Sequence, residues 1–158
     1  ATEAVSVAAS ANHSVIVNLS GPLQIDASFN KRNFEGSVNC GDAAILPAGT
    51  SWSYRNHDEE TGDILLLTVR PLLVRNIAQQ FQLSHTDLTF TPEIGVTNQH
   101  VLHIALSLHD ELLEANLLGR VYADSLAVCL IVQLIKRFSL RDLQVSNGGM
   151  APHKREIC

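Results

Sequence analysis

The stretch that decides the fold reads TNQHVLHIALSLHDELLEANLLGRVYADSLAVCLIVQLIKRF and spans residues 97–138. Its second part, Val121 to Phe138, is apolar around nearly the whole helical circumference. A helix of that kind is expected to be buried on almost all sides. It is not a membrane span, because Gln133, Lys136 and Arg137 interrupt the run before it reaches the ~20 apolar residues that a spanning helix needs. The pattern predicts a core helix of a soluble protein.

The first part, Gln99 to Leu118, carries two apolar stripes at helical spacing. The first is the expected core face and consists of Val101, Ile104, Ala105, Leu108, Leu112 and Ala115. A second stripe of leucines lies beside it. This second stripe either packs against a neighbouring helix or forms a subunit interface, because exposed apolar stripes with polar rims mark such sites. In the second case the interface residues are Leu102, Leu106, His109, Leu113 and Leu117.

The two helical segments are expected to pack as an antiparallel hairpin over about residues 98–138. Thr97 or Asn98 has the side chain that caps a helix start. Gly119 can end the first helix, so the two helices are expected to meet there.

The chain before Arg70 is expected to form short strands separated by turns that contain Gly or Pro. The predicted strands cover residues 15–19, 23–27, 34–38, 43–46, 52–54 and 64–69. Residues 1–12 show no clear strand pattern, a short helix is expected to begin at Pro71, and residues 83–95 are expected to be mostly loop. Because the helices follow the strands rather than alternate with them, the predicted class is α+β, with a small β-barrel or sandwich preceding the helices.

Composition and charge exclude some classes of protein. The 158 residues are 46% hydrophobic and 17% charged, which is ordinary for one globular domain. A net charge of -5 argues against nucleic-acid binding by this chain alone. The cysteines have no paired spacing and one of them, Cys129, is expected inside the buried helix, so free thiols in a reducing cytoplasm are predicted. The start of the chain shows no signal-peptide pattern.

Few constellations in the sequence point to chemistry. There is no nucleophile elbow, phosphate loop or dinucleotide fingerprint. The metal site of a cupin enzyme needs a His-x-His pair on a strand, whereas the strand region here offers only His13 and His57. His100 and His103 lie one turn apart, but on the polar face of their helix. We therefore predict no catalytic residue, no bound metal and no cofactor.

Trp52 and Tyr54 form a close aromatic pair in the strand region. They either belong to the core or surface of the sheets, or line a ligand cavity, where aromatic walls with a few polar groups are typical. In the second case the candidate ligand-binding residues are His13, Gln24, Trp52, Tyr54 and Arg55.

Three stretches, taken in order, carry a family resemblance. They are GDAAILPAGT at residues 41–50, LHDEL through GRVYADSLA at residues 108–127, and GGMAPHK at residues 148–154. Together they resemble the sensor half of AraC-type bacterial transcription regulators: a strand and turn, a pair of helices, and the linker that leads to a double helix-turn-helix domain. The resemblance covers roughly Val15 to Lys154.

The resemblance implies a cupin-like sensor and dimerisation domain over residues 1–146, followed at residues 147–158 by the start of an interdomain linker. The DNA-binding domain of the family is absent, so DNA contact is expected only through a missing C-terminal domain. The expected partners are a second copy of the chain, through helix 98–118, and a small-molecule effector. The protein is expected in the cytoplasm, without membrane contact.

Two alternatives remain open at this point. One is a stand-alone truncated fragment that modulates a full-length partner. The other is a cupin-type enzyme or a sugar-binding protein. The identity of an effector is not encoded in the fold, because pockets on one fold accept unrelated ligands.

Overall fold

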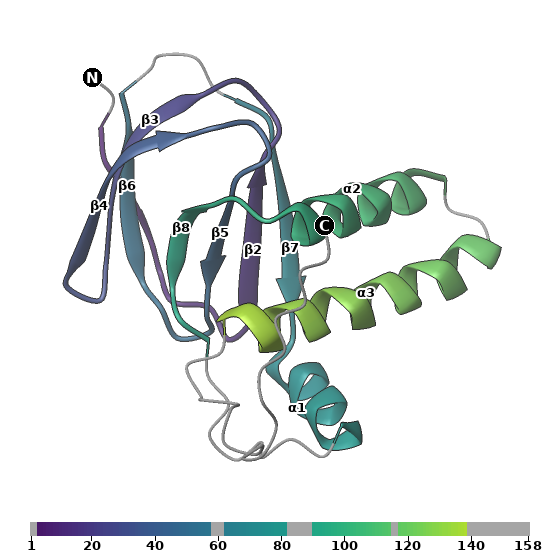
Figure 1. Ribbon diagram of the computed structural model, residues 1–158. Coiled ribbons are helices and arrows are strands. Elements are labelled where there is room, and N and C mark those ends of the chain that lie inside the picture. The colour runs from purple at the N-terminus through teal and green to yellow at the C-terminus, as the bar shows by residue number, and fades with distance from the viewer. Residues whose placement is uncertain (1–2, 58–61, 82–89, 115–116, 139–158) are drawn as a thin grey trace, which may run out of the picture.

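The computed structural model of the protein describes residues 3–57, 62–81, 90–114 and 117–138 (Figure 1). Within these ranges, two four-stranded sheets are accompanied by three helices. The predicted α+β class is therefore confirmed. The predicted linker at residues 147–158 lies outside the described residues.

The two sheets are antiparallel throughout. The first has the order β1 (Val5–Val7), β6 (Trp52–Asn56), β3 (Leu23–Phe29) and β4 (Arg32–Val38). The second has the order β7 (Ile64–Val69), β2 (His13–Asn18), β5 (Ala43–Leu46) and β8 (Glu93–Val96). The tight turn between β3 and β4 uses Asn30 and Lys31 at φ of 48° and 64°. Positive φ at both central residues is what a type I′ hairpin turn requires.

Helices α2 (Gln99–Glu114) and α3 (Leu117–Phe138) lie side by side against the second sheet, on the side away from the first sheet (Figure 1). The shorter α1 (Pro71–Gln80) contacts α3 and begins with a proline, whose missing N–H costs nothing in the first turn. At the start of α2, the Val101 N–H donates to Asn98 Oδ1 at 3.0 Å. Asn98 is therefore the cap, and Thr97 has a different role.

The main hydrophobic core lies between the second sheet and the helices. Val15 and Val17 of β2 are fully buried there, together with Ile45 of β5. The helices contribute Val101 and Ala105 of α2 and a larger set from α3, namely Leu130, Ile131, Leu134, Ile135 and Phe138. Burying each large aliphatic side chain contributes about 1.5–3 kcal/mol, so this layer fixes the helices on the sheet.

Two strands lie where none was predicted. β5 and β7 have the predicted bounds, but β1 lies within residues 1–12, and β8 begins at Glu93, inside the segment 83–95 that was expected to be mostly loop. In β8, Gly95 has a φ of 75°, and a side chain there would approach the ring of Phe34 to 3.2 Å. The expectation of loop is therefore wrong for residues 93–95, because β8 pairs with β5 and packs on β4, and such contacts with distant strands do not show in the local sequence pattern.

Two expectations about the helices are also wrong. Gly119 does not separate them, because α2 ends at Glu114 and α3 has already begun at Leu117. The segment Val121 to Phe138 is not buried on all sides. Val121 is 67% exposed and Cys129 is exposed as well. The sheet, α1 and α2 cover only part of the surface of α3, and the apolar side chains of Val121, Tyr122 and Val128 remain exposed.

Each of the two stripes of α2 contains a described residue that departs from its expected role, and the predicted stripe residues Ala115 and Leu117 have side chains outside the described part of the chain. Leu112, predicted on the core face, is 68% exposed because the end of α2 runs past the edge of the sheet (Figure 1). Leu102, predicted in the interface stripe, is partly buried against the core, with its Cδ2 3.0 Å from where a Cβ would stand on Gly41.

Candidate functional site

A cavity of about 390 Å³ lies between the two sheets. Every one of the eight described strands contributes at least one lining residue. The aliphatic part of the wall consists of Val7, Ile16, Leu23, Ile25, Val38, Ala43, Ala44, Ile64 and Ile94. The remaining lining residues are Asn18, Asp42, Trp52, Tyr54, Asn56, Gly62 and Gly95.

Strand alternation explains how the second sheet serves both the core and this cavity. Successive side chains of a strand point to opposite faces. In β2, Val15 and Val17 face the helices, whereas Ile16 between them faces the cavity. β5 is similar, with Ile45 on the helix side and Ala44 on the cavity side. The small side chain of Ala44 helps to leave the space open.

The aromatic part of the wall comes from β6. Trp52 and Tyr54 are two residues apart on one strand, and both line the cavity. Their rings are stacked, with centroids 5.0 Å apart and planes inclined by 23°. The structure thus brings these two predicted ligand-binding residues to the same cavity.

Asn18, the last residue of β2, lines the cavity and is engaged in hydrogen bonds. Its side-chain amide donates to the carbonyl oxygens of Gly21, Val38 and Asn39 at 3.2, 3.1 and 3.2 Å. Its Oδ1 accepts from both the backbone N–H and the hydroxyl of Ser20, at 3.0 and 3.1 Å. The residue is buried, so these bonds satisfy a polar group that would otherwise be costly.

Asp42 is the second buried polar residue of the wall and is similarly engaged. Its Oδ2 accepts from the Asn39 N–H at 2.9 Å, and its Oδ1 accepts from the Thr97 hydroxyl at 2.8 Å. Thr97 directly precedes Asn98, the cap of α2. A residue of the cavity wall is therefore hydrogen-bonded to the start of the helix pair.

Residues predicted for ligand binding also occur elsewhere. His13 lies in β2 on the same face as Val15, so it points to the helix side rather than to the cavity. Its Nδ1 accepts from the Ala48 N–H at 2.9 Å, and its ring lies edge-on to Phe90 at 4.8 Å. Burial lowers the pKa of His13 below its ordinary value, because desolvation disfavours the charged ring. This arrangement is that of a structural core histidine.

Gln24 and Arg55 do not line the cavity. Gln24 is exposed, and its backbone carbonyl accepts from the His57 N–H at 2.8 Å. Arg55 lies on the outer face of the first sheet, directly across from Asp26 of β3. Arg55 directly follows Tyr54 on β6, and Gln24 lies between the lining residues Leu23 and Ile25 on β3. Strand alternation therefore places both side chains on the face opposite to the cavity.

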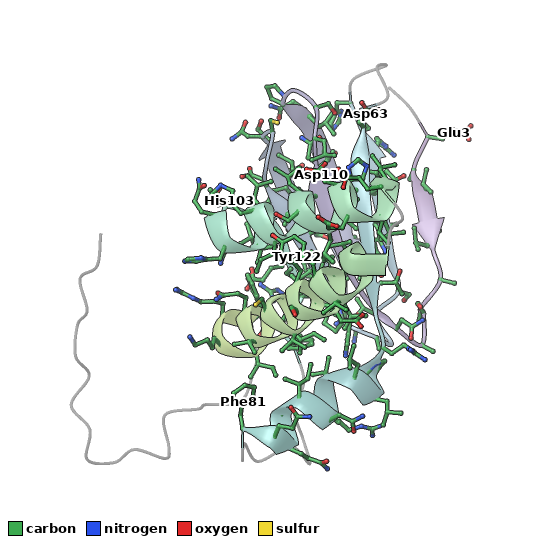
Figure 2. All side chains as sticks on the ribbon, turned by 90° about the vertical axis from the view of Figure 1, so that its right-hand side faces the viewer. Glu3, Asp63, Phe81, His103, Asp110 and Tyr122 are labelled. Atoms are coloured by element: carbon green, nitrogen blue, oxygen red, sulfur yellow. The ribbon has the colours of Figure 1, made fainter. Side chains whose placement is uncertain are left out.

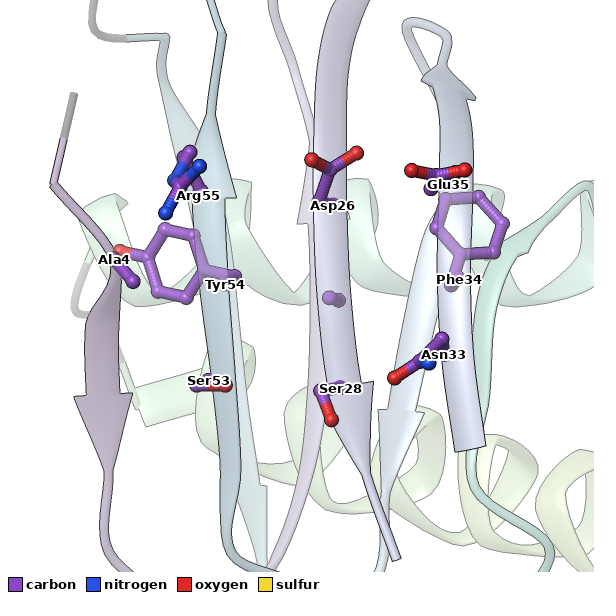
Figure 3. A pocket seen from close by; sticks show the side chains of 10 residues that line it. Ala4, Asp26, Ser28, Asn33, Phe34, Glu35, Ser53, Tyr54 and Arg55 are labelled. Atoms are coloured by element: carbon purple, nitrogen blue, oxygen red, sulfur yellow. The ribbon is translucent and has the colours of Figure 1, made fainter. Parts of the chain in front are cut away.

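The outer face of the first sheet carries a depression of about 450 Å³ (Figure 3). Its polar side chains come from three strands and include Asp26, Ser28, Asn33, Glu35, Ser53 and Arg55. Beside it, His57 Nε2 lies 2.8 Å from Asp26 Oδ2, with both side chains about two-fifths exposed at 43% and 38%. Ion pairs at that exposure contribute little. We interpret this face as a solvated sheet surface.

The open edge of the two-sheet arrangement is apolar. Val5 of β1 lies opposite Tyr54, and Leu66 of β7 lies opposite Ile16, so both share the cavity face. Yet Val5 is 45% exposed and Leu66 56% exposed. β1 and β7 are the free edges of their sheets. Sequence analysis missed this rim, and also the aliphatic wall, because it singled out only polar and aromatic side chains.

Other kinds of site find no support among the described residues. No three His, Cys, Asp or Glu side chains gather there as a metal site would require. His100 and His103 are both exposed. In the same part of the chain, no helix has the length and apolar character to cross a membrane.

Comparison with known proteins gives no family. No protein-family model matches the chain, and no curated protein matches it.

Proposed function

We propose that this chain is a ligand-sensing and dimerisation domain of an AraC-type transcription regulator, which acts by binding rather than by catalysis. The observation that carries the proposal is the cavity between the sheets. Its walls are mostly aliphatic and aromatic with few polar groups, which is the usual character of small-molecule sites. Its wall residue Asp42 is also hydrogen-bonded to Thr97 at the start of the helix pair.

The motif GDAAILPAGT supports the family assignment by having a clear structural role. It spans β5 and the turns on both sides of it. Gly41 and Gly49 both have positive φ, 93° and 84°, a conformation that favours glycine. Leu102 of α2 packs on Gly41, so the motif joins the cavity wall to the helices.

The uncovered side of the helix pair supports dimerisation. Leu106 and Leu113 of the predicted stripe are 37% and 72% exposed. On α3, Val121 and Tyr122 are 67% and 49% exposed, and Val128 is 39% exposed. Figure 2 views the molecule from this side, with Tyr122 on α3 and with His103 and Asp110 on α2 in front of the sheets. Exposed apolar surface of this kind is typical of an interface.

The predicted interface therefore extends onto α3. Leu102 and His109 are only partly exposed, and the side chain of Leu117 lies outside the described residues. Val121 and Val128 are seven residues apart, which places them on one face of α3. We include this face in the proposed dimer surface together with Leu106 and Leu113.

Regulation by an effector requires different affinities for two arrangements of the molecule. The hydrogen bond between Asp42 and Thr97 gives a ligand in the cavity a short route to the start of α2. A ligand that favours one position of Asp42 would thereby favour one position of the helix pair. DNA recognition is not assigned to the described residues of this acidic chain.

Light scattering on charge-insertion variants tests the dimer surface. Leu113→Glu and Leu106→Glu each place a charge in the proposed interface and are expected to convert a dimer to a monomer. Leu72→Glu is the matched control, because Leu72 is 58% exposed but lies on α1. The control should remain dimeric. Dimers that persist in both α2 variants would place the interface elsewhere.

A further inference from the structure

We infer that the cavity between the sheets binds an uncharged, largely apolar small molecule, which enters along the open edge between β1 and β7. The inference rests on the proposed function, because it takes this cavity as the ligand site. It adds the chemical class of the ligand and its route of entry.

The charge of the wall excludes an anionic ligand. Among the residues that the structure describes, no Lys, Arg or His side chain lines the cavity, and the one carboxylate in its wall is that of Asp42. A carboxylate or phosphate group inside would be desolvated without a cationic partner, and the nearby Asp42 would repel it. An unpaired charge in such surroundings costs several kcal/mol.

The hydrogen bonds of the wall argue against a ligand with many hydroxyl groups. The amide of Asn18 donates to three backbone carbonyls, and each oxygen of Asp42 already accepts a hydrogen bond. The indole N–H of Trp52 and the hydroxyl of Tyr54 can serve one or two polar atoms of a ligand. A sugar would bury further hydroxyl groups against aliphatic side chains, each at a cost.

The aromatic and aliphatic surfaces define what the cavity accepts. The stacked rings of Trp52 and Tyr54 give a flat apolar wall, and Ile16, Ile25 and Ile94 supply branched aliphatic surface. Burial of apolar ligand surface against such walls is favourable by about 25 cal/mol per Å². The wall therefore fits a neutral aromatic or aliphatic molecule.

The route of entry follows from the edges of the sheets. β4 and β8 contact each other, and the ring of Phe34 lies against Gly95 there. The strands at the other ends of the two sheets are β1 and β7. Their cavity-facing residues Val5, Ile64 and Leu66 are 45%, 55% and 56% exposed, so apolar surface continues from the cavity to solvent at this edge.

Two dyes that differ by one charged group test the ligand class. N-phenyl-1-naphthylamine is neutral, and 1-anilinonaphthalene-8-sulfonate has the same aromatic framework with a sulfonate. Trp52 is the single tryptophan of the chain and lines the cavity, so energy transfer from Trp52 reports a dye bound beside it. The neutral dye should give saturable transfer, and the sulfonate should bind at least ~100-fold more weakly.

Cavity-filling variants locate the bound dye. Ala44→Phe places a ring in the cavity and should weaken binding of the neutral dye by about tenfold or more, and Ala44→Leu should weaken it less. Ala4→Phe adds the same ring at an exposed residue of the outer depression and should leave binding unchanged. Far-UV circular dichroism establishes that each variant is folded, and Ala44→Leu remains informative if Ala44→Phe does not fold.

Each contrary outcome has a distinct meaning. Equal affinity for the two dyes, with both weakened by filling the cavity, would overturn the ligand class and leave the sensing function standing. Absence of energy transfer, or binding of the neutral dye that neither Ala44 variant changes, would overturn the inference and the sensing part of the proposed function together. The light-scattering result on dimerisation is independent of both.

Discussion

Replacement of Asn18 tests the hydrogen-bond network around this residue of the cavity wall. Asn18 is 3% exposed, and its side chain takes part in five hydrogen bonds, three as donor and two as acceptor. Asn18→Ala removes all of them and leaves the Val38 carbonyl oxygen as the most deeply buried acceptor without its donor. The segment around Val38 and Asn39 would then lose its side-chain link to β2, while the backbone hydrogen bonds between Asn18 and residues 41 and 42 remain.

The magnitude follows from the burial of these bonds. The bond to Val38 is buried and should be worth about 1–1.5 kcal/mol, whereas the other four are only part-buried and should be worth roughly 0.5 kcal/mol each. The expected loss in the free energy of unfolding is therefore about 3 kcal/mol. That is a large part of the roughly 5–15 kcal/mol by which a domain is usually stable.

Urea unfolding, followed by Trp52 fluorescence and by far-UV circular dichroism, measures this loss. Asn33→Ala is the control, because Asn33 is exposed on β4, and its effect should stay within about 0.5 kcal/mol. Asn18→Asp keeps the acceptor oxygens but loses the amide donors, so it should cost at least as much as Asn18→Ala. A loss below about 1 kcal/mol for Asn18→Ala would refute the reasoning.

Two further predictions concern the core. Leu134→Ala on α3 should lower the free energy of unfolding, measured in urea, by about 3–4 kcal/mol, because Leu134 is fully buried. Leu112→Ala, at a residue 68% exposed, should lower it by less than about 1 kcal/mol. Equal losses for the two variants would show that the core is misplaced. Because burial lowers the pKa of His13 below 6.5, the unfolded chain binds the extra proton, so the contribution of His13 to stability is complete above about pH 6.5 and is lost as the pH falls further. His13→Asn should flatten the slope of stability below about pH 6.5, and an unchanged slope would show that His13 does not titrate in this way.

The sequence predicted correctly those strands that begin and end at turn residues recognisable in the sequence itself. Ala43 to Leu46 is an apolar run between a Gly-Asp turn and a Pro-Ala-Gly turn, and it forms β5 as expected. β8 contains Gly95 and follows Pro92, which locally suggest a loop. It is a strand because it pairs with β5 and packs on Phe34, and such long-range contacts have no local signature.

Because α3 is apolar around nearly its whole circumference, the sequence predicted that it would be buried on almost all sides. Within a single chain, part of its apolar surface remains exposed. The sequence shows that Val121 and Val128 are apolar, but it does not show which part of the protein, or which partner, covers them. Within the described residues, the sheet and α2 cover the side that carries Leu134. We attribute the uncovered side to contact with a second copy, as proposed above.

The candidate site could be predicted only in part for a related reason. Trp52 and Tyr54 are two residues apart on one strand, and both line the cavity, as one of the two alternatives for this pair required. The same alternation shows that His13 and Ile16 face opposite ways, but not which face of β2 meets the helices and which meets the cavity. Both faces of the second sheet are covered, so that choice depends on tertiary packing.

The molar mass of the unmodified chain, measured by light scattering across a concentration series, tests the central claim most directly. The account predicts a species of twice the chain mass of 17.2 kDa that dissociates on dilution. It predicts this because the uncovered apolar side of α2 and α3 needs a partner. A mass of 17.2 kDa at every concentration would contradict the claim that this chain is a dimerisation domain.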